Sequence, residues 1–318
     1  MKNAVFLNSS KVDFDQKLNL DNLKKEVNIT LYEKTDPKDM LLRAKDQQIV
    51  ITKEIPMGRE LIEKLPSCVE LICEAGTGYN NIDIRAARER NITVCNIPSY
   101  SSAAVAQLAF SFILSLCSSL SEQQIMIRGG KFDNFTKHLQ VNHFEVSGKT
   151  LGVIGAGKIA GDVIKKARAF DMKVLVYSRT RRDFMDENIR FVTLEELLTD
   201  SDFVTVHCPL TEETRYLIDK EKLSLMKPEA YLINTSRGAI IKEEDLVEAL
   251  RNKKIAGAAL DVLEKEPASL DNPLFSLDNC ILTPHIGWQC LETRQRLIDM
   301  LADNIHAYLL GKPINQVN

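Results

Sequence analysis

The chain has 318 residues, 44% of them apolar and 27% charged, and its 41 basic and 44 acidic residues leave a formal net charge of −3. This length suits about two domains of roughly 100–200 residues each. The composition excludes a disordered chain, a collagen-like fibre and a coiled-coil rod. The small net charge gives no strong field that would attract nucleic acid or acidic lipid.

Cysteine usage and hydropathy bear on the compartment. The seven cysteines are odd in number, form no C-x-x-C pair and lie mostly in apolar runs. This pattern indicates reduced thiols and no metal site. The longest apolar stretch, 103–117, has about 15 residues, fewer than the roughly 20 that a membrane span needs. The apolar run at 4–7 is too short for a signal peptide. We therefore expect a cytoplasmic protein with neither membrane nor nucleic-acid partners.

In the first third of the chain, short apolar runs alternate with helical patterns. Strands are expected at residues 4–7, 29–32, 48–52, 71–74 and 93–96. Helices are expected at residues 18–26, 37–44, 58–64 and 82–90. Such alternation predicts an α/β unit with a doubly wound parallel sheet.

A second alternating unit begins at Gly148. Its strands are expected at 150–154, 173–177, 203–207, 231–234, 255–260 and 281–283, and its helices at 158–170, 194–199, 220–226 and 243–252. Thr193 and Glu196 match a capping box. Six strands with crossover helices predict a dinucleotide-binding fold. Of two further helices, 101–120 is apolar nearly all round and is expected to be buried between domains or subunits, and 291–310 ends before Gly311 and Pro313.

A glycine-rich turn follows the first strand of this second unit. Gly155 permits a tight turn, Gly157 lets the backbone approach a pyrophosphate, and Ala160 fills the third position of the motif. The helix that follows offers unpaired N–H groups, so the expected cofactor site also includes Lys158 and Ile159.

The end of the next strand bears on which cofactor binds. An acidic residue there would bind the ribose 2′-hydroxyl of NAD, but the chain has Ser178, followed by Arg179, Arg181 and Arg182. Serine and arginine favour a 2′-phosphate, so we expect NADP as the preferred cofactor. The alternative is a solvated basic loop with NAD bound.

Three polar residues follow three successive strands of the second unit. They are Arg237, Glu266 and His285. Ligands of open α/β sheets bind beyond the carboxyl ends of the strands. A guanidinium suits a 2-oxo carboxylate, a histidine exchanges a proton near neutral pH, and a glutamate beside it favours the charged imidazole. The joint occurrence predicts a catalytic site.

With these residues in place, the sequence resembles the D-isomer-specific 2-hydroxyacid dehydrogenases. The motifs that carry the resemblance span nearly the whole chain and are AGTGYNNID (75–83), GVIGAGKIAG (152–161), HCPLTEETRYLI (207–218), INTSRGAII (233–241), LDVLEKEP (260–267) and TPHIGW (283–288).

The resemblance implies roles for individual residues. Arg237 would bind the substrate and polarise its carbonyl, His285 would exchange the proton, and Glu266 would pair with His285. Backbone N–H groups of Thr77 and Gly78 would hold the substrate carboxylate. Trp288 is either a substrate contact or a packed aromatic. The remaining positions implied at the cofactor are Cys208, Pro209, Thr235, Ser236, Asp261 and Gly287.

The resemblance also implies an architecture. A flavodoxin-like substrate domain would comprise residues 1–100 and 290–318, and a Rossmann cofactor domain residues 101–289. The active site would lie in the cleft between them. Helix 101–120 would form a homodimer interface.

Within the family, glycerate dehydrogenase/hydroxypyruvate reductase is the group the chain is most similar to, through Gln107, Trp288 and the final helix. This implies NAD(P)H-dependent reduction of a small 2-oxo acid to a D-2-hydroxy acid. One alternative is a phosphoglycerate-type dehydrogenase, although the loop 75–80 has no basic residue and the nearest in sequence is Arg85. Another is a non-catalytic nicotinamide-sensing corepressor. Formate dehydrogenases of this family have Gln at the position of Glu266, so Glu266 argues against the formate dehydrogenase branch. Asn80 stands where the family usually has Asp.

Overall fold

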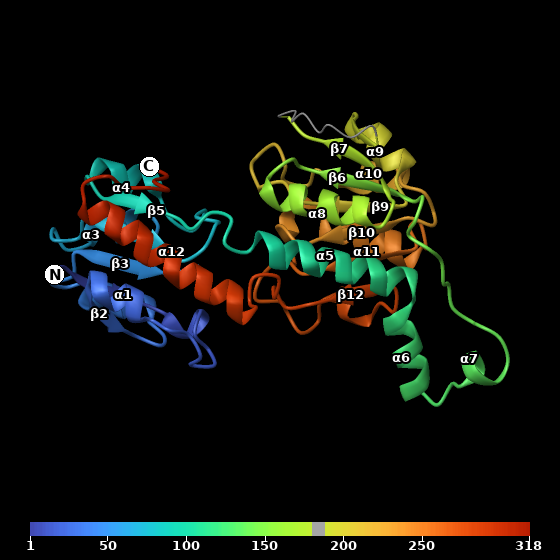
Figure 1. Ribbon diagram of the computed structural model, residues 1–318, viewed down its shortest axis with the longest axis horizontal. Coiled ribbons are helices and arrows are strands. Elements are labelled where there is room, and N and C mark those ends of the chain that lie inside the picture. The colour runs from blue at the N-terminus through green and yellow to red at the C-terminus, as the bar shows by residue number, and fades with distance from the viewer. Residues whose placement is uncertain (180–187) are drawn as a thin grey trace. The chain divides into compact units, whose positions relative to one another are not determined.

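The computed structural model describes residues 1–179 and 188–318, and these form two compact units (Figure 1). Unit 1 consists of Met1–Ser101 and Trp288–Asn318, and unit 2 of Ser102–Gly287. Each unit is built on a parallel sheet with helices on both faces, which confirms the expected α/β class.

Unit 1 holds a five-stranded sheet in the order β2-β1-β3-β4-β5, with every pairing parallel. This is the flavodoxin-like strand order. The expected strands are confirmed to within one residue at each end. Their bounds are β1 Asn3–Phe6, β2 Asn28–Leu31, β3 Ile49–Thr52, β4 Leu71–Glu74 and β5 Thr93–Cys95.

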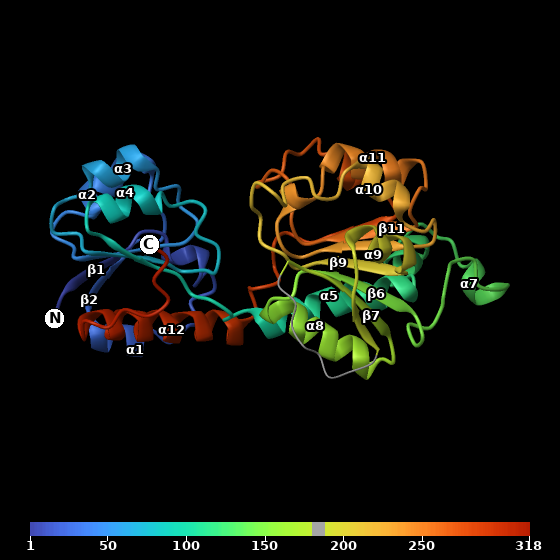
Figure 2. The same ribbon diagram turned by 90° about the horizontal axis from the view of Figure 1, so that it is seen from above.

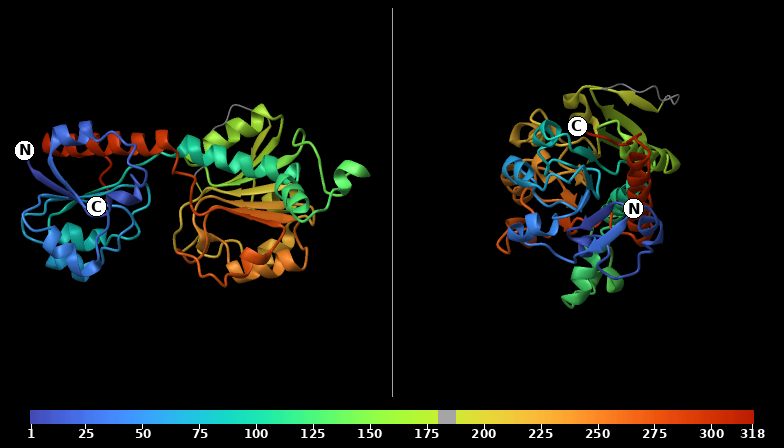
Figure 3. Two further views of the ribbon diagram at one scale, coloured as in Figure 1. Left: turned by 90° about the horizontal axis from the view of Figure 1, so that it is seen from below. Right: turned by 90° about the vertical axis from the view of Figure 1, so that its left-hand side faces the viewer.

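Helices cover both faces of this sheet (Figure 2). Helices α1 (Asp21–Glu26) and α12 (Leu291–Leu309) lie side by side on one face (Figure 3). The other face carries α2 (Met40–Arg43), α3 (Arg59–Lys64) and α4 (Ile84–Glu89). Because successive strand residues point to opposite faces, Ala4 and Phe6 join the core under α12, while Val5 joins the opposite core. This two-sided burial explains the continuous apolar runs in the sequence.

Unit 2 holds a seven-stranded parallel sheet in the order β12-β11-β10-β9-β6-β7-β8. This is the doubly wound dinucleotide-binding order with one further strand, and the order reverses between β6 and β9. The sequence missed β8, a three-residue edge strand, and so predicted six strands. The bounds are β6 Thr150–Ile154, β7 Lys173–Tyr177, β8 Ile189–Phe191, β9 Phe203–Val206, β10 Tyr231–Asn234, β11 Gly257–Leu260 and β12 Cys280–Leu282.

Two helical layers cover the sheet of unit 2. One face carries α5 (Ser102–Cys117) and α8 (Lys158–Ala169), and the other carries α9 (Leu194–Asp200), α10 (Lys220–Leu225) and α11 (Glu243–Arg251). The expected cap is present, since the Thr193 side chain accepts a hydrogen bond from the Glu196 N–H at 3.1 Å. Two short helices that the sequence did not predict follow α5, namely α6 (Leu120–Arg128) and α7 (Asp133–Thr136).

The structure shows what covers the apolar side of helix 101–120 within its own unit. Ala106, Ala109 and Ile113 of α5 pack into the core of unit 2, against α8 and β10, so its buried face is filled within its own unit. Its exposed positions are Ala103, Gln107 and Ser111. Over the described ranges no single helix has the length and apolar character to cross a membrane, and only α5 and α6 together, bent by 60°, reach that threshold by length and composition.

Candidate active site

The glycine-rich turn joins β6 to α8. Gly155 has φ +110°, and a β-carbon there would lie 2.8 Å from the His207 carbonyl carbon, so both conformation and space require glycine. Gly157 caps α8 without a side-chain hydrogen bond, and a β-carbon there would meet nothing within 4 Å. The start of α8, where Lys158 and the half-buried Ile159 stand, is thus open for a phosphate to approach its N–H groups.

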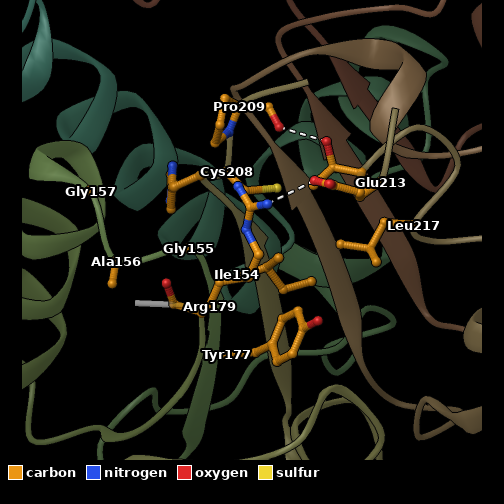
Figure 4. Close-up of a pocket in the computed structure, with 13 residues that line it drawn as sticks. Ile154, Gly155, Ala156, Gly157, Tyr177, Arg179, Cys208, Pro209, Glu213 and Leu217 are labelled. Carbon is orange, nitrogen blue, oxygen red and sulfur yellow. Dashed lines mark hydrogen bonds and ion pairs between the residues drawn. The ribbon is translucent and has the colours of Figure 1, made fainter. Parts of the chain in front are cut away.

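A cavity of about 330 Å³ lies against this turn, at the point where the strand order of unit 2 reverses (Figure 4). Dinucleotides bind at this place in doubly wound sheets. Three of the predicted cofactor positions line it together: the glycine turn, the end of β7 and the loop after β9. The lining residues are Ile154, Gly155, Ala156, Gly157, Tyr177, Ser178, Arg179, His207, Cys208, Pro209, Glu213, Thr214 and Leu217.

His207 is a cavity residue to which the sequence assigned no role. Its Nε2 lies 2.8 Å from Thr205 Oγ1, whereas its Nδ1 is buried with no partner in the described part of the chain. Burial lowers the pKa of His207 to about 3, so the ring is neutral. Beside it, burial raises the pKa of the Cys208 thiol to about 11. Both side chains therefore line the cavity without charge, and His207 keeps an unused polar atom for a ligand.

At the end of β7, Ser178 and Arg179 both line the cavity. Arg179 Nη1 donates to Glu213 Oε2 at 2.7 Å, and the two side chains are each 70% exposed. The sequence reasoning did not include Glu213. Arg181 and Arg182, which the cofactor prediction also used, lie outside the described residues.

The turn after β10 carries Thr235, Ser236 and Arg237, and Asn234 shapes it. The buried Asn234 amide donates to the Arg237 carbonyl at 2.9 Å and accepts from the Ser236 N–H at 3.0 Å. Ser236 Oγ donates to the Cys208 carbonyl at 2.5 Å, which ties the turn to the loop after β9. Thr235 Oγ1 is buried and has no partner among the atoms that the structure describes. A ligand at this edge would find that hydroxyl available.

Asp261, directly after β11, fixes the loop that carries His285. Its Oδ1 accepts from Thr283 Oγ1 at 2.6 Å and from the Ile286 N–H at 2.8 Å, and its Oδ2 accepts from the Gly287 N–H at 2.9 Å. Burial raises the pKa of Asp261, and these hydrogen bonds oppose that rise. The carboxylate predicted to face the cofactor is thus engaged in holding the 283–287 loop.

His285 and Glu266 meet at the ends of neighbouring strands. His285 Nδ1 lies 2.9 Å from Glu266 Oε2, while Glu266 Oε1 accepts from the Leu263 N–H at 3.0 Å. His285 has φ +54°, a left-handed conformation that costs energy in a non-glycine residue and that the bonds to Asp261 hold in place. The dyad therefore has a fixed imidazole orientation, with Nε2 as the ring atom that Glu266 does not engage.

Arg237 reaches the same edge of the sheet. A β-carbon on the neighbouring Gly238 would lie 2.0 Å from the Leu263 carbonyl, so the backbones after β10 and β11 touch. Because β10, β11 and β12 are adjacent and parallel, Arg237, Glu266 and His285 all follow strand ends at one edge. An anion-binding fork and an oriented proton carrier are the parts that reduction of a carbonyl needs.

Thr77, Gly78 and Trp288 belong to unit 1. Thr77 Oγ1 donates to the Ile97 carbonyl at 2.9 Å, and Asn96 Nδ2 donates to the Thr77 carbonyl at 2.7 Å. The N–H groups of Thr77 and Gly78 make no hydrogen bond within the ranges described. The loop is thus held from its carbonyl side, which leaves two donors for a carboxylate.

A cation lies beside this loop in space, although the loop has no basic residue of its own and the nearest in sequence is Arg85. The Lys53 ammonium would be 3.0 Å from a β-carbon on Gly76, and it lies 4.5 Å from the centre of the Trp288 ring. The Lys53 side chain is only 4% exposed and donates to Glu54 at 2.5 Å. Trp288 is itself buried in the core of unit 1. Lys53 follows β3, so only the fold brings it to the loop.

Comparison with known proteins agrees with this geometry. Residues 110–287 match the family described as D-isomer specific 2-hydroxyacid dehydrogenase, NAD binding domain. A hydroxypyruvate reductase from Blautia hydrogenotrophica is 40% identical over 287 residues, which cover 89% of each chain. A glyoxylate reductase from Thermococcus litoralis is 38% identical over 294 residues, covering 90% of this chain and 88% of the relative.

A solved structure shares the fold over the full length. An acyclic imino acid reductase in complex with NADPH and D-Arg superposes with a TM-score of 0.87 at 29% identity, covering 99% of this chain and 100% of the other. The chain belongs to the D-isomer specific 2-hydroxyacid dehydrogenase family, as the motifs indicated. It is an oxidoreductase that uses a nicotinamide cofactor.

Proposed function

We propose that this enzyme reduces small 2-oxo acids of the hydroxypyruvate and glyoxylate type to D-2-hydroxy acids, with NADPH preferred over NADH. The observation that carries the proposal is the His285–Glu266 dyad, 2.9 Å across, at the sheet edge that also carries Arg237. The names of the two relatives, a hydroxypyruvate reductase and a glyoxylate reductase, support the substrate class.

A bound nicotinamide cofactor would supply the hydride for this reduction. Gly155 and Gly157 would hold its pyrophosphate, assisted by the start of α8 at Lys158 and Ile159. His207, Cys208 and Pro209 line the cavity beside it. Thr235, Ser236 and Gly287 would contact its nicotinamide end, and Asp261 holds the loop that carries Gly287.

Two kinds of group would hold the substrate: backbone N–H donors and the guanidinium of Arg237. Arg237 binds the carboxylate and carbonyl oxygens with its planar fork. The N–H groups of Thr77 and Gly78 hold the carboxylate, and Trp288 borders the site. His285 Nε2 gives its proton to the carbonyl oxygen as that oxygen gains charge, while Glu266 keeps the ring oriented.

Lys53 bears on the phosphoglycerate-type alternative. A cation beside the 76–78 loop would suit an added phosphate, but Lys53 is already paired with Glu54, and the buried Glu74 lies close by. The pairing with Glu54 leaves Lys53 less able to neutralise a dianion. We therefore favour a small monoanionic acid. Steady-state turnover of hydroxypyruvate and glyoxylate, set against 3-phosphoglycerate oxidation, tests this choice.

The cofactor preference rests on Ser178 and Arg179 at the end of β7. Neither residue repels a 2′-phosphate, and both line the cavity. We expect kcat/KM to be higher with NADPH than with NADH, and Ser178→Asp to reverse that order because a carboxylate accepts the ribose hydroxyl and repels the phosphate. A wild-type preference for NADH would overturn the cofactor part of the proposal and leave the substrate part standing.

We further propose a cytoplasmic homodimer. The exposed face of α5 is small and polar, whereas the segment after it exposes large apolar side chains. These are Leu120, Ile125, Phe132, Phe135 and Leu139. Such side chains favour an interface in residues 120–139, next to α5. Light scattering on the wild type and on Phe135→Ser tests this, since a monomeric wild type would contradict it.

A further inference from the structure

Glu213 lies at the cavity, opposite the position where a cofactor acid is missing. The usual acid at the end of β7 is replaced by Ser178, but Glu213 brings a carboxylate to the same cavity from the loop after β9. Its Oε2 accepts from Arg179 Nη1 at 2.7 Å, across 34 positions of sequence. Figure 4 shows this pair at the cavity, with Arg179 extending from β7 and Glu213 from the facing loop.

The turn that carries Glu213 is held independently of Arg179. Thr214 Oγ1 donates to the Pro209 carbonyl at 2.7 Å and accepts from the Thr211 N–H at 2.7 Å. Thr211 Oγ1 also lies 3.4 Å from Glu213 Oε2. The backbone of this turn, and with it the place of Glu213 beside the cavity, therefore does not depend on the bond to Arg179.

The charges of this pair set up a competition. Arg179 is the one cation of the end of β7 that the structure describes at the cavity, and Glu213 already neutralises it. Exposed ion pairs are weak because water screens both charges, whereas a phosphate takes stronger charge-assisted hydrogen bonds from a guanidinium. A 2′-phosphate can thus replace Glu213 on Arg179, but the carboxylate stays close by and repels it.

We propose that Glu213 is a cofactor-specificity residue that competes with the 2′-phosphate for Arg179 and so restrains the preference for NADPH. With NADH bound, Arg179 keeps its bond to Glu213, so this cation stays paired. With NADPH bound, Arg179 turns to the phosphate. The pair therefore lets one cavity accept both cofactors. This inference rests on the proposed function, through the position of the cofactor ribose at the end of β7.

The test is Glu213→Gln, compared with Glu212→Gln as a matched control. Glu212 is the exposed neighbour of the same type, and it does not line the cavity. Dissociation constants for NADPH and NADH are measured on the full chain by cofactor fluorescence. Removing one charge near a dianion at high dielectric should tighten NADPH binding on the order of 3–10-fold. NADH affinity should change less than about twofold, and Glu212→Gln should leave both constants unchanged.

A double-mutant cycle separates competition from simple charge repulsion. In an Arg179→Gln background the two groups no longer share a cation, so Glu213→Gln should tighten NADPH binding less than it does in wild type. Equal NADPH affinities for Glu213→Gln and Glu212→Gln would overturn the proposal, as would a loss of NADH affinity without a gain for NADPH. Cofactor dissociation constants do not require turnover. If the enzyme failed to turn over hydroxypyruvate and glyoxylate, the proposed function would be contradicted, but the binding test of Glu213 would still be valid.

Discussion

Replacing Glu74 by Gln should remove a pH dependence of stability that is built into unit 1. Glu74 ends β4 and is fully buried; its Oε1 accepts from the Glu54 N–H at 2.9 Å and its Oε2 from Asn81 Nδ2 at 2.9 Å. Burial raises the pKa of Glu74 to about 7, against the opposing effects of the Lys53 charge and these hydrogen bonds. The folded unit therefore holds a proton on Glu74 at pH values where the unfolded chain has lost it.

The sign and size of the effect follow from that difference. The pKa of this carboxyl is 4.5 in the unfolded reference and about 7 in the fold. Its contribution to stability is fully present below pH 4.5 and falls as the pH rises toward 7, because the unfolded state releases the proton first. At about 1.4 kcal/mol for each tenfold change in proton affinity, the free energy of unfolding should fall by about 3 kcal/mol across that range.

The assay can be confined to the correct unit, because Trp288 is the only tryptophan of the chain and lies in the core of unit 1. Urea unfolding followed by tryptophan fluorescence, at several pH values from 4.5 to 8, gives the free energy for wild type and for Glu74→Gln. The difference between the two proteins isolates Glu74, since all other groups titrate in both. Lys53→Met should enlarge the dependence, because the charge that opposes burial is removed.

A difference between wild type and Glu74→Gln that stays constant with pH would show that Glu74 keeps its ordinary pKa. A difference that grows in favour of wild type as the pH rises would show that the attraction of Lys53 outweighs burial. Either result would refute the reasoning.

Three further predictions concern the site. His285→Ala should lower kcat on the order of 10²–10⁴-fold while cofactor affinity persists, and unchanged turnover would exclude His285 as the proton donor. Arg237→Lys should raise KM for 2-oxo acids and lower kcat, because the fork is lost; wild-type values for both would remove it as the substrate anchor. Gly155→Ala should destabilise the cofactor-free protein by about 1–3 kcal/mol, whereas Gly157→Ala should weaken NADPH binding and leave thermal stability unchanged; equal melting temperatures for the two variants would contradict this.

Much of the fold could be predicted from sequence because parallel strands buried on both faces leave continuous apolar runs. The runs at β4 and β6 were located to the residue. The edge strand β8 was not predicted because it spans only Ile189–Phe191 and is only partly buried, so it has no continuous apolar run. Helices α6 and α7 were not predicted for a related reason. Neither contains a buried residue, so neither shows apolar residues at helical spacing.

The residues of the candidate site also fall into those that the sequence predicts and those that only the fold brings together. Residues directly after strands, such as Arg237 and His285, could be found because strand ends are visible in the sequence. Lys53 beside Trp288 and Arg179 beside Glu213 could not, because each pair joins segments that only the strand order brings together. The engagement of Asp261 by the 283–287 loop was also invisible, since it depends on the hydrogen bonds of individual backbone groups.

Unit 1 is assembled from both ends of the chain, and this affects the order in which the protein matures on the ribosome. Chains emerge N-terminus first, but the sheet face that carries Ala4 and Phe6 is covered by Leu297, Leu301 and Ile305 of α12. The Val317 N–H also closes the edge of β5 by donating to the Val94 carbonyl. The half that is synthesised first brings α1 to this face, but the part of the face that α12 covers stays exposed until all of unit 2 has been translated. All residues of unit 2 are translated before α12, so unit 2 has its complete core available before unit 1 does, although unit 1 is begun first.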